Sequence, residues 1–524
     1  MFRSRKLFSV VLVVVIVGLL TSSLAFASQG SEWNSAGGNR QNTRNQGSEH
    51  TLSVSNVSSL SPKWVFSTAG DVSATPAVDA DTVYFPDWKG NLYAVDKLTG
   101  AKKWQVSIAD ASGVLFDKAR STPAVTDDKL IIGTQGSILA PGGGPGAKVL
   151  AFNKFTGALL WSTAVDSHPA AIITQSATVF DNRVYVGVAS QEEVLSLSPG
   201  YQLSFRGSML ALDLNTGAIL WKTYTVPDGF TGGAVWGSSP AIDTQRGQVY
   251  IGTGNNYSVP QAVLDCVTAA GNDSAAISAC LPANDYFDSI MALDLVTGAV
   301  RWSTRAIPYD AWTVDCIPFF GGGSNCPNPA GPDYDFGQAP ALFSVKLDGK
   351  GKSIDMVGAG QKSGQYWALD PATGAVQWVT QAGPGGTAGG LQWGSAVDGK
   401  RVYTANANSN FVPWPTASGA TSGVWSGLDA ATGQVLWERR PPDGGSTSGP
   451  VTTANGLVFG CSLDSQGHMY ALNAANGAVL WSFASGGSCL SGASISDGML
   501  FWGSGYSNFG FGTGNNQLYA FGLP

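Results

Sequence analysis

One short pattern recurs along this chain and restricts the folds that are open to it. The pattern is Ala-x-Asp/Asn-x-x-Thr-Gly-x-x-x-Trp, with small variations, and an apolar alternation precedes each copy. Seven copies are present, and they end at Trp104, Trp161, Trp221, Trp302, Trp378, Trp437 and Trp481. A repeat of one supersecondary unit over the whole chain is typical of solenoids and propellers, so we expect one repeat domain instead of several unrelated ones.

Each part of the pattern has a physical role. The Asp or Asn side chain can cap its own turn, and the Gly supplies a backbone conformation with positive φ that other residues resist. The Trp then appears at a fixed offset on the next strand. A four-stranded blade cannot bury both of its faces alone, so a large flat side chain between neighbouring blades favours stacking. We therefore expect the Trp residues of the repeat to be structural.

An eighth copy is divided between the two ends of the chain. Residues 516–521 form the front half of a repeat, and residues 62–66 (Pro-Lys-Trp-Val-Phe) form a Trp-bearing strand without a front half. Pairing these two segments would close a ring and remove its exposed edge strands. The predicted fold is all-β: a single eight-bladed β-propeller of four-stranded blades over residues 28–524.

The first 27 residues resemble a cleavable secretory signal peptide. Arg3, Arg5 and Lys6 form a basic start, residues 7–20 are almost wholly apolar, and Ala25-Phe26-Ala27 is a small-x-small cleavage site. A membrane anchor is the alternative, but the apolar run is short for a span. We expect cleavage after Ala27, a periplasmic or secreted protein and no membrane anchor.

Composition excludes some partners. The net charge is −7 and only 12% of the residues are charged, so binding to nucleic acid or to an anionic membrane is not expected. The six Cys residues of a secreted chain most simply form disulfide bonds, and proximity suggests Cys266–Cys280, Cys316–Cys326 and Cys461–Cys489. Fifteen connectivities are formally open. None of these residues lies in Cys-x-x-Cys-His, so covalent haem is not expected.

Several segments resemble one family. The Trp repeat is similar to the docking motif of propellers that use pyrroloquinoline quinone (PQQ) and of related propellers without a cofactor. Residues 33–44 (Trp-Asn-Ser-Ala-Gly-Gly-Asn-Arg-Gln-Asn-Thr-Arg), 234–240 (Ala-Val-Trp-Gly-Ser-Ser-Pro) and 361–364 (Gln-Lys-Ser-Gly) resemble polyvinyl-alcohol-dehydrogenase-like members of the PQQ-dependent alcohol dehydrogenases. The resemblance covers essentially the whole chain after the signal segment.

The resemblance implies a metal ion beside the cofactor. Glu193, with Glu192 as the alternative, follows an expected strand where the family has a metal-binding Glu. Asn255, in Gly-Thr-Gly-Asn, matches a family metal ligand. A carboxylate and an amide oxygen suit Ca²⁺, or a lanthanide, better than Zn²⁺. The alternatives are a solvated loop carboxylate for Glu193 and a simple turn residue for Asn255.

The resemblance also implies contacts to PQQ. Trp236 matches the residue that stacks under the ring, Arg120 matches a cation that pairs with a carboxylate, and Thr174 matches a hydroxyl donor. Ser190, which precedes the metal-binding segment, is expected to contact the cofactor. Lys362 falls where the family has Lys or Arg near the reactive carbonyl. Core packing for Trp236 and solvent exposure for the two cations are the alternatives.

The catalytic base departs from the family pattern. The family has an Asp after the Trp of His-Asp-x-Trp-Asp, whereas this chain has Thr313 after Trp312. Asp315 lies two residues further, on the same side of an extended chain, and coincides with an extra metal-ligand Asp of the lanthanide-using branch. Asp315 is therefore the predicted base and a possible metal ligand, and Asp310 is the other catalytic candidate.

Taken together, the resemblance implies a PQQ- and metal-dependent dehydrogenase of small or polymeric alcohols, among them secondary alcohols and polyvinyl alcohol. Without a haem motif, its electrons would pass to a separate acceptor such as a cytochrome c. Two alternatives stay open. The first is a non-catalytic propeller that acts as a scaffold or binding protein. The second, supported by Thr313, is a propeller that has lost PQQ and binds another ligand.

Overall fold

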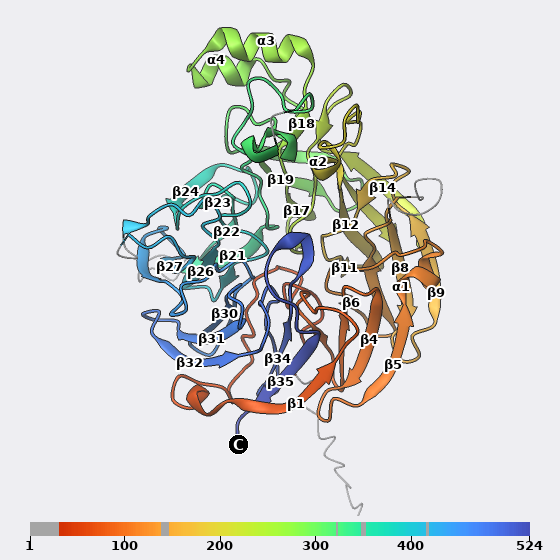
Figure 1. Ribbon diagram of the computed structural model, residues 1–524, viewed down its shortest axis with the longest axis vertical. Coiled ribbons are helices and arrows are strands. Elements are labelled where there is room, and N and C mark those ends of the chain that lie inside the picture. Colours follow the sequence, from red (N-terminus) through yellow and green to blue (C-terminus); the bar gives the residue numbers. More distant parts are fainter. Residues whose placement is uncertain (1–30, 138–145, 321–322, 347–352, 416–418) are drawn as a thin grey trace, which may run out of the picture.

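The computed structural model describes residues 31–137, 146–320, 323–346, 353–415 and 419–524. The predicted signal segment, residues 1–27, lies outside the described residues. Eight sheets follow one another around a common centre, as the colour gradient of Figure 1 shows, and each is an antiparallel blade. The predicted all-β, eight-bladed propeller is therefore confirmed. In the described part of the chain, no helix is long and apolar enough to cross a membrane.

The first four blades run in chain order. Their strands are β2 (Ala77–Val78), β3 (Thr82–Pro86), β4 (Asn91–Asp96) and β5 (Lys102–Ser107) in blade 1; β6 (Ala124–Val125), β7 (Lys129–Gly133), β8 (Lys148–Asn153) and β9 (Leu159–Ala164) in blade 2; β11 (Thr178–Phe180), β12 (Arg183–Ser190), β13 (Ser208–Asp213) and β14 (Ile219–Tyr224) in blade 3; and β16 (Ala241–Asp243), β17 (Gln248–Gly252), β19 (Ser289–Asp294) and β20 (Val300–Arg305) in blade 4.

The next three blades repeat the same order. Their strands are β21 (Ala341–Lys346), β22 (Ser353–Gly360), β23 (Gln365–Leu369) and β24 (Val376–Gln381) in blade 5; β25 (Ala396–Val397), β26 (Arg401–Asn406), β27 (Val424–Asp429) and β28 (Val435–Arg439) in blade 6; and β29 (Thr452–Ala454), β30 (Leu457–Cys461), β31 (His468–Asn473) and β32 (Val479–Ala484) in blade 7.

Blade 8 joins the two ends of the chain. It contains β33 (Ser494–Ser496), β34 (Met499–Ser504) and β35 (Gln517–Gly522), and its outer strand is β1 (Ser61–Ser67). β1 pairs antiparallel with β35, so that Trp64 lies opposite Ala520. This is the predicted closure of the ring, and no blade edge is left open at the junction.

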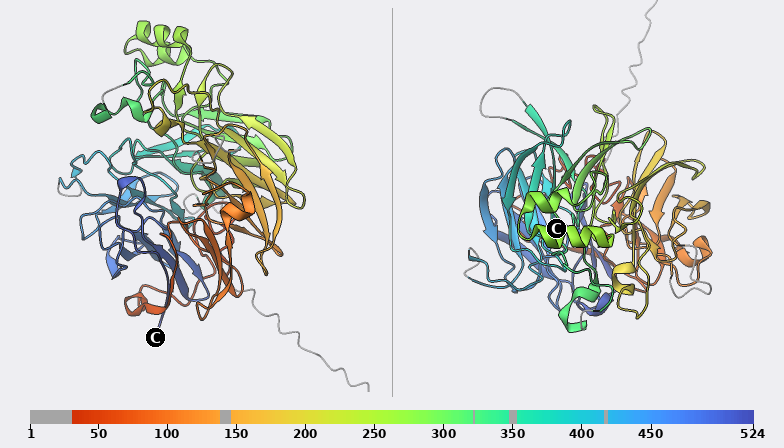
Figure 2. Two further views of the ribbon diagram at one scale, coloured as in Figure 1. Left: turned by 45° about the vertical axis from the view of Figure 1, so that its right-hand side comes forward. Right: turned by 90° about the horizontal axis from the view of Figure 1, so that it is seen from above.

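Short elements decorate this ring. They are β10 (Ala171–Ile172), β15 (Thr231–Gly232), β18 (Asn256–Ser258), α1 (Ile108–Ser112), α2 (Glu192–Leu195), α3 (Gln261–Ala270), α4 (Ser274–Ala279), and the 3₁₀ turns η1 (Val57–Ser59), η2 (Val314–Cys316), η3 (Pro318–Phe320) and η5 (Asn508–Gly510). Figure 2 shows that α3 and α4 project from the rim as an arm. The three predicted disulfides, Cys266–Cys280, Cys316–Cys326 and Cys461–Cys489, are all present.

The repeat turn explains how neighbouring blades pack. In blade 1, Asp96 Oδ1 accepts hydrogen bonds from the backbone N–H and the hydroxyl of Thr99, and Gly100 adopts φ +71°. A Cβ on Gly100 would lie 2.7 Å from the Trp64 ring of the preceding blade. The Trp64 indole also donates to the Lys97 carbonyl at 3.0 Å. The Gly therefore has two functions, a positive φ and room for the Trp, and the repeat Trp is structural as predicted.

The same contact recurs around the ring. Seven repeat glycines have a positive φ, and a Cβ on each would come within 3.0 Å of the Trp of the preceding blade: Gly100, Gly157, Gly217, Gly298, Gly374, Gly433 and Gly477.

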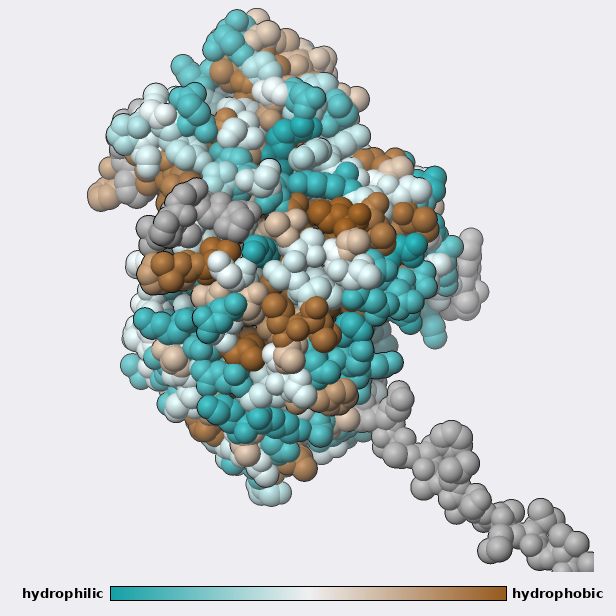
Figure 3. Space-filling model, turned by 90° about the vertical axis from the view of Figure 1, so that its right-hand side faces the viewer, coloured by the Kyte–Doolittle hydropathy of each residue, from teal (hydrophilic) through white to brown (hydrophobic). Residues whose placement is uncertain are grey.

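Figure 3 shows one face of the molecule, where hydrophobic residues form separate patches among hydrophilic ones. The apolar side chains that matter for stability lie between and within the blades.

The N-terminal segment, residues 33–46, runs past the first strand of every blade. Its backbone or side chains hydrogen-bond to seven of these strands, at Val78, Val125, Ile242, Leu342, Val397, Thr453 and Ile495. At the remaining blade, blade 3, the Arg40 guanidinium lies 5.5 Å from the centre of the Phe180 ring. One segment of chain therefore ties together all eight blades near the propeller axis.

Candidate functional site

The antiparallel order of each blade places two kinds of loop at the same end of the propeller. These are the loop between the second and third strands, and the loop that leads from the outer strand of one blade into the first strand of the next. We call this end the site end. It holds Glu193 and Asn255 in loops of the first kind and Arg120 and Trp236 in loops of the second kind. The Thr-Gly turns lie at the opposite end.

A pocket of about 200 Å³ opens among these loops. It is lined by six of the residues that the sequence predicted for the cofactor and metal, together with several others: Arg120, Thr174, Ser190, Glu193, Trp236, Lys362, Ile172, Ala189, Ala234, Tyr257, Asp335, Gln392 and Trp393. Residues that are far apart in the sequence, from position 120 to position 393, are thus brought to one place by the ring.

Trp236 is held firmly in this pocket. The Thr174 hydroxyl donates to the Trp236 carbonyl at 2.8 Å, and the indole N–H donates to Asp335 Oδ2 at 2.9 Å. Lys362 Nζ lies 5.6 Å from the ring centre. Behind the ring, a Cβ on Gly337 would lie 2.7 Å from the indole. The indole is therefore fixed in orientation, as a platform for a planar ligand must be.

Three carboxylates form an acid cluster beside this platform. One oxygen from each of Glu193, Asp333 and Asp335 lies within 4.8 Å of the others, and the two aspartates are fully buried. Lys362 Nζ lies 2.7 Å from Asp333 Oδ1 and 3.0 Å from Asp335 Oδ2. The cluster therefore holds three acidic groups against one ammonium group.

Burial and crowding shift the protonation of these groups. Burial raises the pKa of Glu193 to about 7, with Lys362 acting in the opposite direction. Burial also raises the pKa of Asp333 well above its usual range, again against the effect of Lys362. Burial alone would lower the pKa of Lys362, but the carboxylates of Asp333 and Asp335 raise it well above its usual range. A bound cation would relieve the repulsion among the acids.

Asn255 supplies a further oxygen. Its amide nitrogen donates to the carbonyls of Asn256 and Trp312, which fixes the orientation of the amide, and its Oδ1 has no protein partner although the residue is buried. Its backbone N–H donates to Asp335 Oδ1 at 2.7 Å. Buried polar atoms normally have partners. An oxygen-only donor set with one unpartnered amide oxygen fits a hard cation such as Ca²⁺ or a lanthanide.

Glu192, the alternative to Glu193, has a different role. It is fully buried, and its carboxylate accepts hydrogen bonds from the backbone N–H groups of Ser204 and Phe205 and from the Tyr201 hydroxyl. These bonds tie α2 to the loop that precedes β13. Glu192 therefore positions the loop, and Glu193 is the residue that reaches the acid cluster.

The structure does not bring the predicted base, Asp315, to the cluster. Asp315 Oδ1 accepts from the Gly323 N–H at 3.1 Å and Oδ2 accepts from the Asn325 N–H at 2.9 Å, so the carboxylate secures the loop next to the Cys316–Cys326 disulfide. Thr313 donates its hydroxyl to the Asn325 carbonyl. Both residues serve the architecture of the loop between β20 and β21.

Asp310 lies behind the cluster. Its carboxylate accepts from the backbone N–H groups of Asp333 and Tyr334, at 3.2 and 2.8 Å, and burial raises its pKa to about 6. Asp310 is not among the residues that line the pocket. Its contacts make it a positioning residue for Asp333.

Asp333, Asp335 and Trp393 are the functional candidates that the sequence reasoning missed. Asp333 and Asp335 occupy alternate positions in Asp-Tyr-Asp just before β21, where a loop enters the first strand of a blade at the site end. Two acidic residues separated by one residue, in a loop of mostly uncharged residues, were the sequence signal that could have indicated them. Trp393 adopts φ +62°, which is uncommon for a large side chain and is typical of functional positions.

Arg120 lies between two aromatic rings. Its guanidinium carbon is 5.1 Å from the centre of the Trp88 ring and 4.7 Å from that of Trp393. Trp393 in turn meets Trp236 edge to face, with centroids 5.1 Å apart. Among the described residues, no carboxylate lies within ion-pairing distance of Arg120. The pocket thus offers an oriented cation for a carboxylate, an aromatic platform for a planar ring and a cluster that can bind a metal ion. These are the features that a binding site for PQQ needs.

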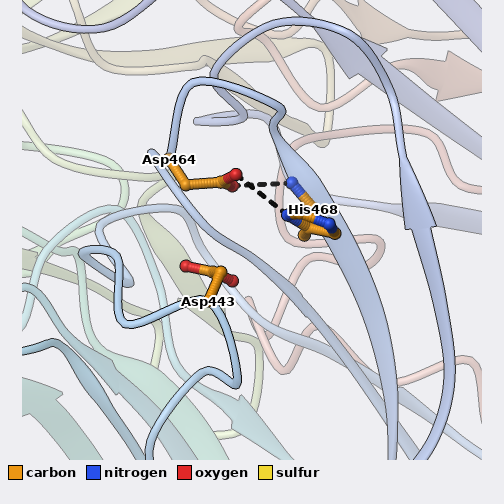
Figure 4. Close-up of side chains that lie close together, drawn as sticks. All are labelled: Asp443, Asp464 and His468. Atoms are coloured by element: carbon orange, nitrogen blue, oxygen red, sulfur yellow. Dashed lines mark hydrogen bonds and ion pairs between the residues drawn. The ribbon is translucent and has the colours of Figure 1, made fainter.

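A second acidic group, Asp443, Asp464 and His468, lies near the surface of blade 7 (Figure 4). Asp464 Oδ2 and His468 Nδ1 are 2.9 Å apart, and the Asp464 Oδ1 accepts from the His468 N–H. Asp443 accepts from Ser462 and from the Tyr470 hydroxyl. Each carboxylate is occupied by loop contacts, so this rim cluster holds loops together, in contrast to the acid cluster.

Comparison with known families places the chain among PQQ-type propellers. The family described as "Outer membrane protein assembly factor BamB" matches residues 49–304 and 362–521. The unmatched interval includes η2, the Cys316–Cys326 loop and Asp333. Similarity to that family therefore covers the repeats, and it omits the loop that supplies two of the three carboxylates.

Two curated proteins and one solved structure resemble the chain over most of its length. A polyvinylalcohol dehydrogenase of Sphingopyxis sp. (strain 113P3) is 30% identical, over 93% of this chain and 74% of that protein. A polyvinylalcohol dehydrogenase of Pseudomonas sp. is 28% identical, over 86% of this chain and 67% of that protein. The crystal structure of quinohemoprotein alcohol dehydrogenase from Comamonas testosteroni superposes with a TM-score of 0.69 at 19% identity, over 95% of this chain and 81% of that one.

Proposed function

Because the chain belongs to the family of PQQ-dependent alcohol dehydrogenases, we propose that it oxidises secondary alcohols or hydroxyl-bearing polymers such as polyvinyl alcohol. The observation that carries the proposal is the acid cluster beside the fixed indole of Trp236, with Asn255 Oδ1 left without a partner. Three crowded acids, two of which line the pocket or its wall, and a buried amide oxygen without a partner fit a cation site better than a structural core.

Specific residues would hold the cofactor and the metal ion. Glu193, Asp335 and Asn255 Oδ1 are the proposed metal ligands, and Trp236, Arg120, Thr174, Ser190 and Lys362 are the proposed contacts of PQQ. The bound quinone supplies the two-electron acceptor, and a bound Ca²⁺ or lanthanide ion supplies Lewis acidity. The chain's own residues must bind the alcohol and remove its hydroxyl proton.

Asp333 is the proposed base, in place of Asp315. Its carboxylate is buried, and Lys362 Nζ lies 2.7 Å from Oδ1. Burial raises the pKa of Asp333, which strengthens the carboxylate as a base, while the nearby ammonium group favours its ionised form. Asp333 does not itself line the pocket, but it contacts Lys362, which does. It would accept the alcohol proton there, and Asp310 would keep its backbone in place through two hydrogen bonds.

The electrons would leave to a separate acceptor, for which a cytochrome c is our proposal. All six cysteines form disulfides, so none is available for a thioether to haem. The disulfides also support a periplasmic or secreted location, since such bonds persist in oxidising compartments. The predicted signal peptide, with cleavage after Ala27, is consistent with that location.

Cofactor reconstitution tests the proposal. The mature protein would be titrated with PQQ in the presence of Ca²⁺ or a lanthanide, and reduction of a dye would be followed with 2-propanol, 2-butanol and polyvinyl alcohol. We expect saturable, metal-dependent activity that Glu193→Ala and Trp236→Ala abolish. Asp443→Ala, in the rim cluster, is the matched control and should retain activity.

Two results would contradict the proposal. If PQQ binds without turnover of any alcohol, the protein is a binding propeller. If PQQ does not bind with any metal, the chain is a scaffold, as the name of its matching family suggests, or a propeller for another ligand. Measuring PQQ binding and dye reduction in the same samples separates these outcomes.

A further inference from the structure

A second, small cavity, of about 50 Å³, lies at the propeller axis next to the cofactor pocket. We call it the axial cavity. Arg120, Thr174 and Trp393 line both cavities, so the two share a wall. The loops that enter the first strands of blades 1, 2 and 4 contribute Thr75, Ser121 and Ser238 to the axial cavity, and the N-terminal segment contributes Arg44.

Arg44 is a buried cation without a buried anion. The residue is only 1% exposed, and among the described residues no carboxylate lies within ion-pairing distance of its guanidinium. Its Nε and Nη1 donate to the carbonyls of Val451 and Ala36, at 2.7 and 2.5 Å. Its Nη2 donates to the hydroxyls of Thr75 and Thr452, at 3.1 and 3.4 Å, so all of its partners are neutral. Burial lowers the pKa of Arg44 to about 9, and no neighbouring carboxylate acts in the opposite direction. An unpaired buried charge is costly.

The chain makes room for this side chain at a conformational cost. A Cβ on Gly492 would lie 2.2 Å from Arg44 Nη2, and a Cβ on Gly394, which has φ +141°, would lie 2.8 Å from Arg44 Cδ. Arg44 itself has φ +49° and Asn42 has φ +58°. Strained backbone persists where the surroundings enforce it, and such positions concentrate at ligand sites.

The axial cavity is lined by hydrogen-bond donors and not by acids. Of the described residues, no Asp or Glu lines it, while Ser73, Thr75, Ser121, Thr122, Ser176 and Ser238 all present hydroxyl groups. Ser121 Oγ is buried without any hydrogen-bond partner. The Ser238 and Thr122 hydroxyls, by contrast, donate to the carbonyls of Trp393 and Thr75. Ser121 therefore has a free donor in a cavity that contains two guanidinium groups.

We propose that the axial cavity is an oxyanion site in which Arg44 and Ser121 bind a carboxylate or an inorganic oxyanion. Two sources have this chemistry. One is a carboxylate of PQQ, which rests on the proposed function and would make Arg44 a second recognition cation beside Arg120. The other is a small oxyanion from solution, which needs no cofactor. In both cases a negative charge compensates the buried cation.

Ser121→Ala and Arg44→Lys test the proposal. The first removes one hydroxyl and leaves the backbone intact, and the second keeps the charge but loses the planar fork of donors. Ser494→Ala is the matched control, because Ser494 Oγ is also buried without a partner but lies in β33, outside the residues that line the cavity. Far-ultraviolet circular dichroism and thermal melting check that each variant folds. If Arg44→Lys does not fold, Ser121→Ala alone tests the proposal.

The binding of PQQ, measured by quenching of Trp fluorescence, and of inorganic phosphate, measured by calorimetry, distinguish the two sources. For a PQQ carboxylate, we expect each test variant to weaken PQQ about tenfold, phosphate to compete with PQQ, and Ca²⁺ affinity to stay unchanged. For an anion from solution, the wild type binds phosphate without PQQ, and the variants lose that binding. If neither variant changes PQQ or phosphate binding relative to Ser494→Ala, the axial cavity is not an oxyanion site. The phosphate arm requires no turnover, so it stands apart from the dehydrogenase test.

Discussion

The axial cavity and the acid cluster lie on either side of the same wall of residues but carry opposite charge. The axial cavity has two guanidinium groups, Arg44 and Arg120, and no acid among its described lining residues. The acid cluster has three carboxylates around one ammonium group, that of Lys362. A ligand with carboxylates at one end and a metal-bound carbonyl at the other would neutralise both regions at once. The charge separation therefore favours one orientation for such a ligand.

The comparison also shows two ways to tolerate a buried charge. In the acid cluster, burial raises the pKa of Glu193 to about 7, against the effect of Lys362 and with a smaller contribution from the neighbouring acids, so part of the charge is removed by protonation when no cation is bound. In the axial cavity, the guanidinium of Arg44 keeps its charge near neutral pH and relies on carbonyl and hydroxyl partners. The first region therefore responds to pH near neutrality, and the second does not.

The largest expected effect separates Asp333 from Asp315. Asp333→Asn removes the proposed base without changing the size of the side chain, so we expect kcat to fall by about 10³-fold while PQQ and metal still bind. Asp315→Asn, the control in the neighbouring loop, should alter kcat only slightly, because the Asp315 carboxylate secures residues 323–325. Dye-linked kinetics measure both. Equal losses would assign both residues to loop architecture.

The next effect tests whether the acid cluster is the metal site. Glu193→Gln keeps a polar side chain and removes one negative charge, so we expect Ca²⁺ or Tb³⁺ to bind about 100-fold more weakly. Asp443→Asn, in the rim cluster of Figure 4, should leave the affinity unchanged. Sensitised Tb³⁺ luminescence gives both affinities. A loss in Asp443→Asn and none in Glu193→Gln would move the metal to blade 7.

A smaller effect concerns the wall between the two regions. Arg120→Lys keeps the charge but loses the paired N–H groups and the stacking between Trp88 and Trp393, so PQQ should bind about tenfold more weakly. The affinity for Ca²⁺ in the absence of PQQ should not change. If metal affinity falls together with PQQ affinity, the two regions are coupled through the wall and do not act separately.

The last effect is on stability against pH and leaves both cavities unchanged. Burial raises the pKa of Asp285 to about 7, so the folded state holds a proton that the unfolded chain releases near pH 4. The free energy of unfolding without metal should therefore fall as the pH rises from about 4 to 7, by at most about 1.4 kcal/mol per pH unit for this group. Asp285→Asn should flatten the slope, and Arg44→Lys should not. Thermal melts across this pH range check both variants. If the free energy of unfolding depends on pH equally in Asp285→Asn and in the wild type, the prediction for Asp285 is wrong.

The fold was predictable because each blade carries the same short sequence motif, and that motif determines the turn and the packing of the blade. The Asp cap, the Gly with positive φ and the Trp are local to eleven residues, and the split copy at residues 516–521 and 62–66 specifies the closure. The disulfide pairs were predictable as well, because each joins residues that are close in the sequence. Local signals suffice when the structural unit is itself local.

The site was only partly predictable, because it depends on loops that differ between blades. Trp236, Arg120 and Glu193 lie in loops that are shorter than the loop before β21 and whose motifs keep their register, and the structure brings them together. The predicted base, Asp315, is not among the residues of the acid cluster. The loop before β21 contains the Cys316–Cys326 disulfide, which ties Asp315 into a turn and leaves Asp333 as the residue that enters the cluster. The sequence spacing between a motif and a residue does not predict the path of a long, disulfide-bonded loop.

The N-terminal segment has a consequence for the order in which the molecule is built. Residues 33–46 are synthesised early, yet their partners extend to Ile495 in the last blade. The segment cannot reach its final contacts until all eight blades exist, and such long-range contacts form slowly. Arg44, which the segment carries into the axis, would then be the last wall of the axial cavity to arrive. The full set of contacts of the first part of the chain is therefore complete only when the last blade is present, and a finished cofactor pocket requires a finished ring.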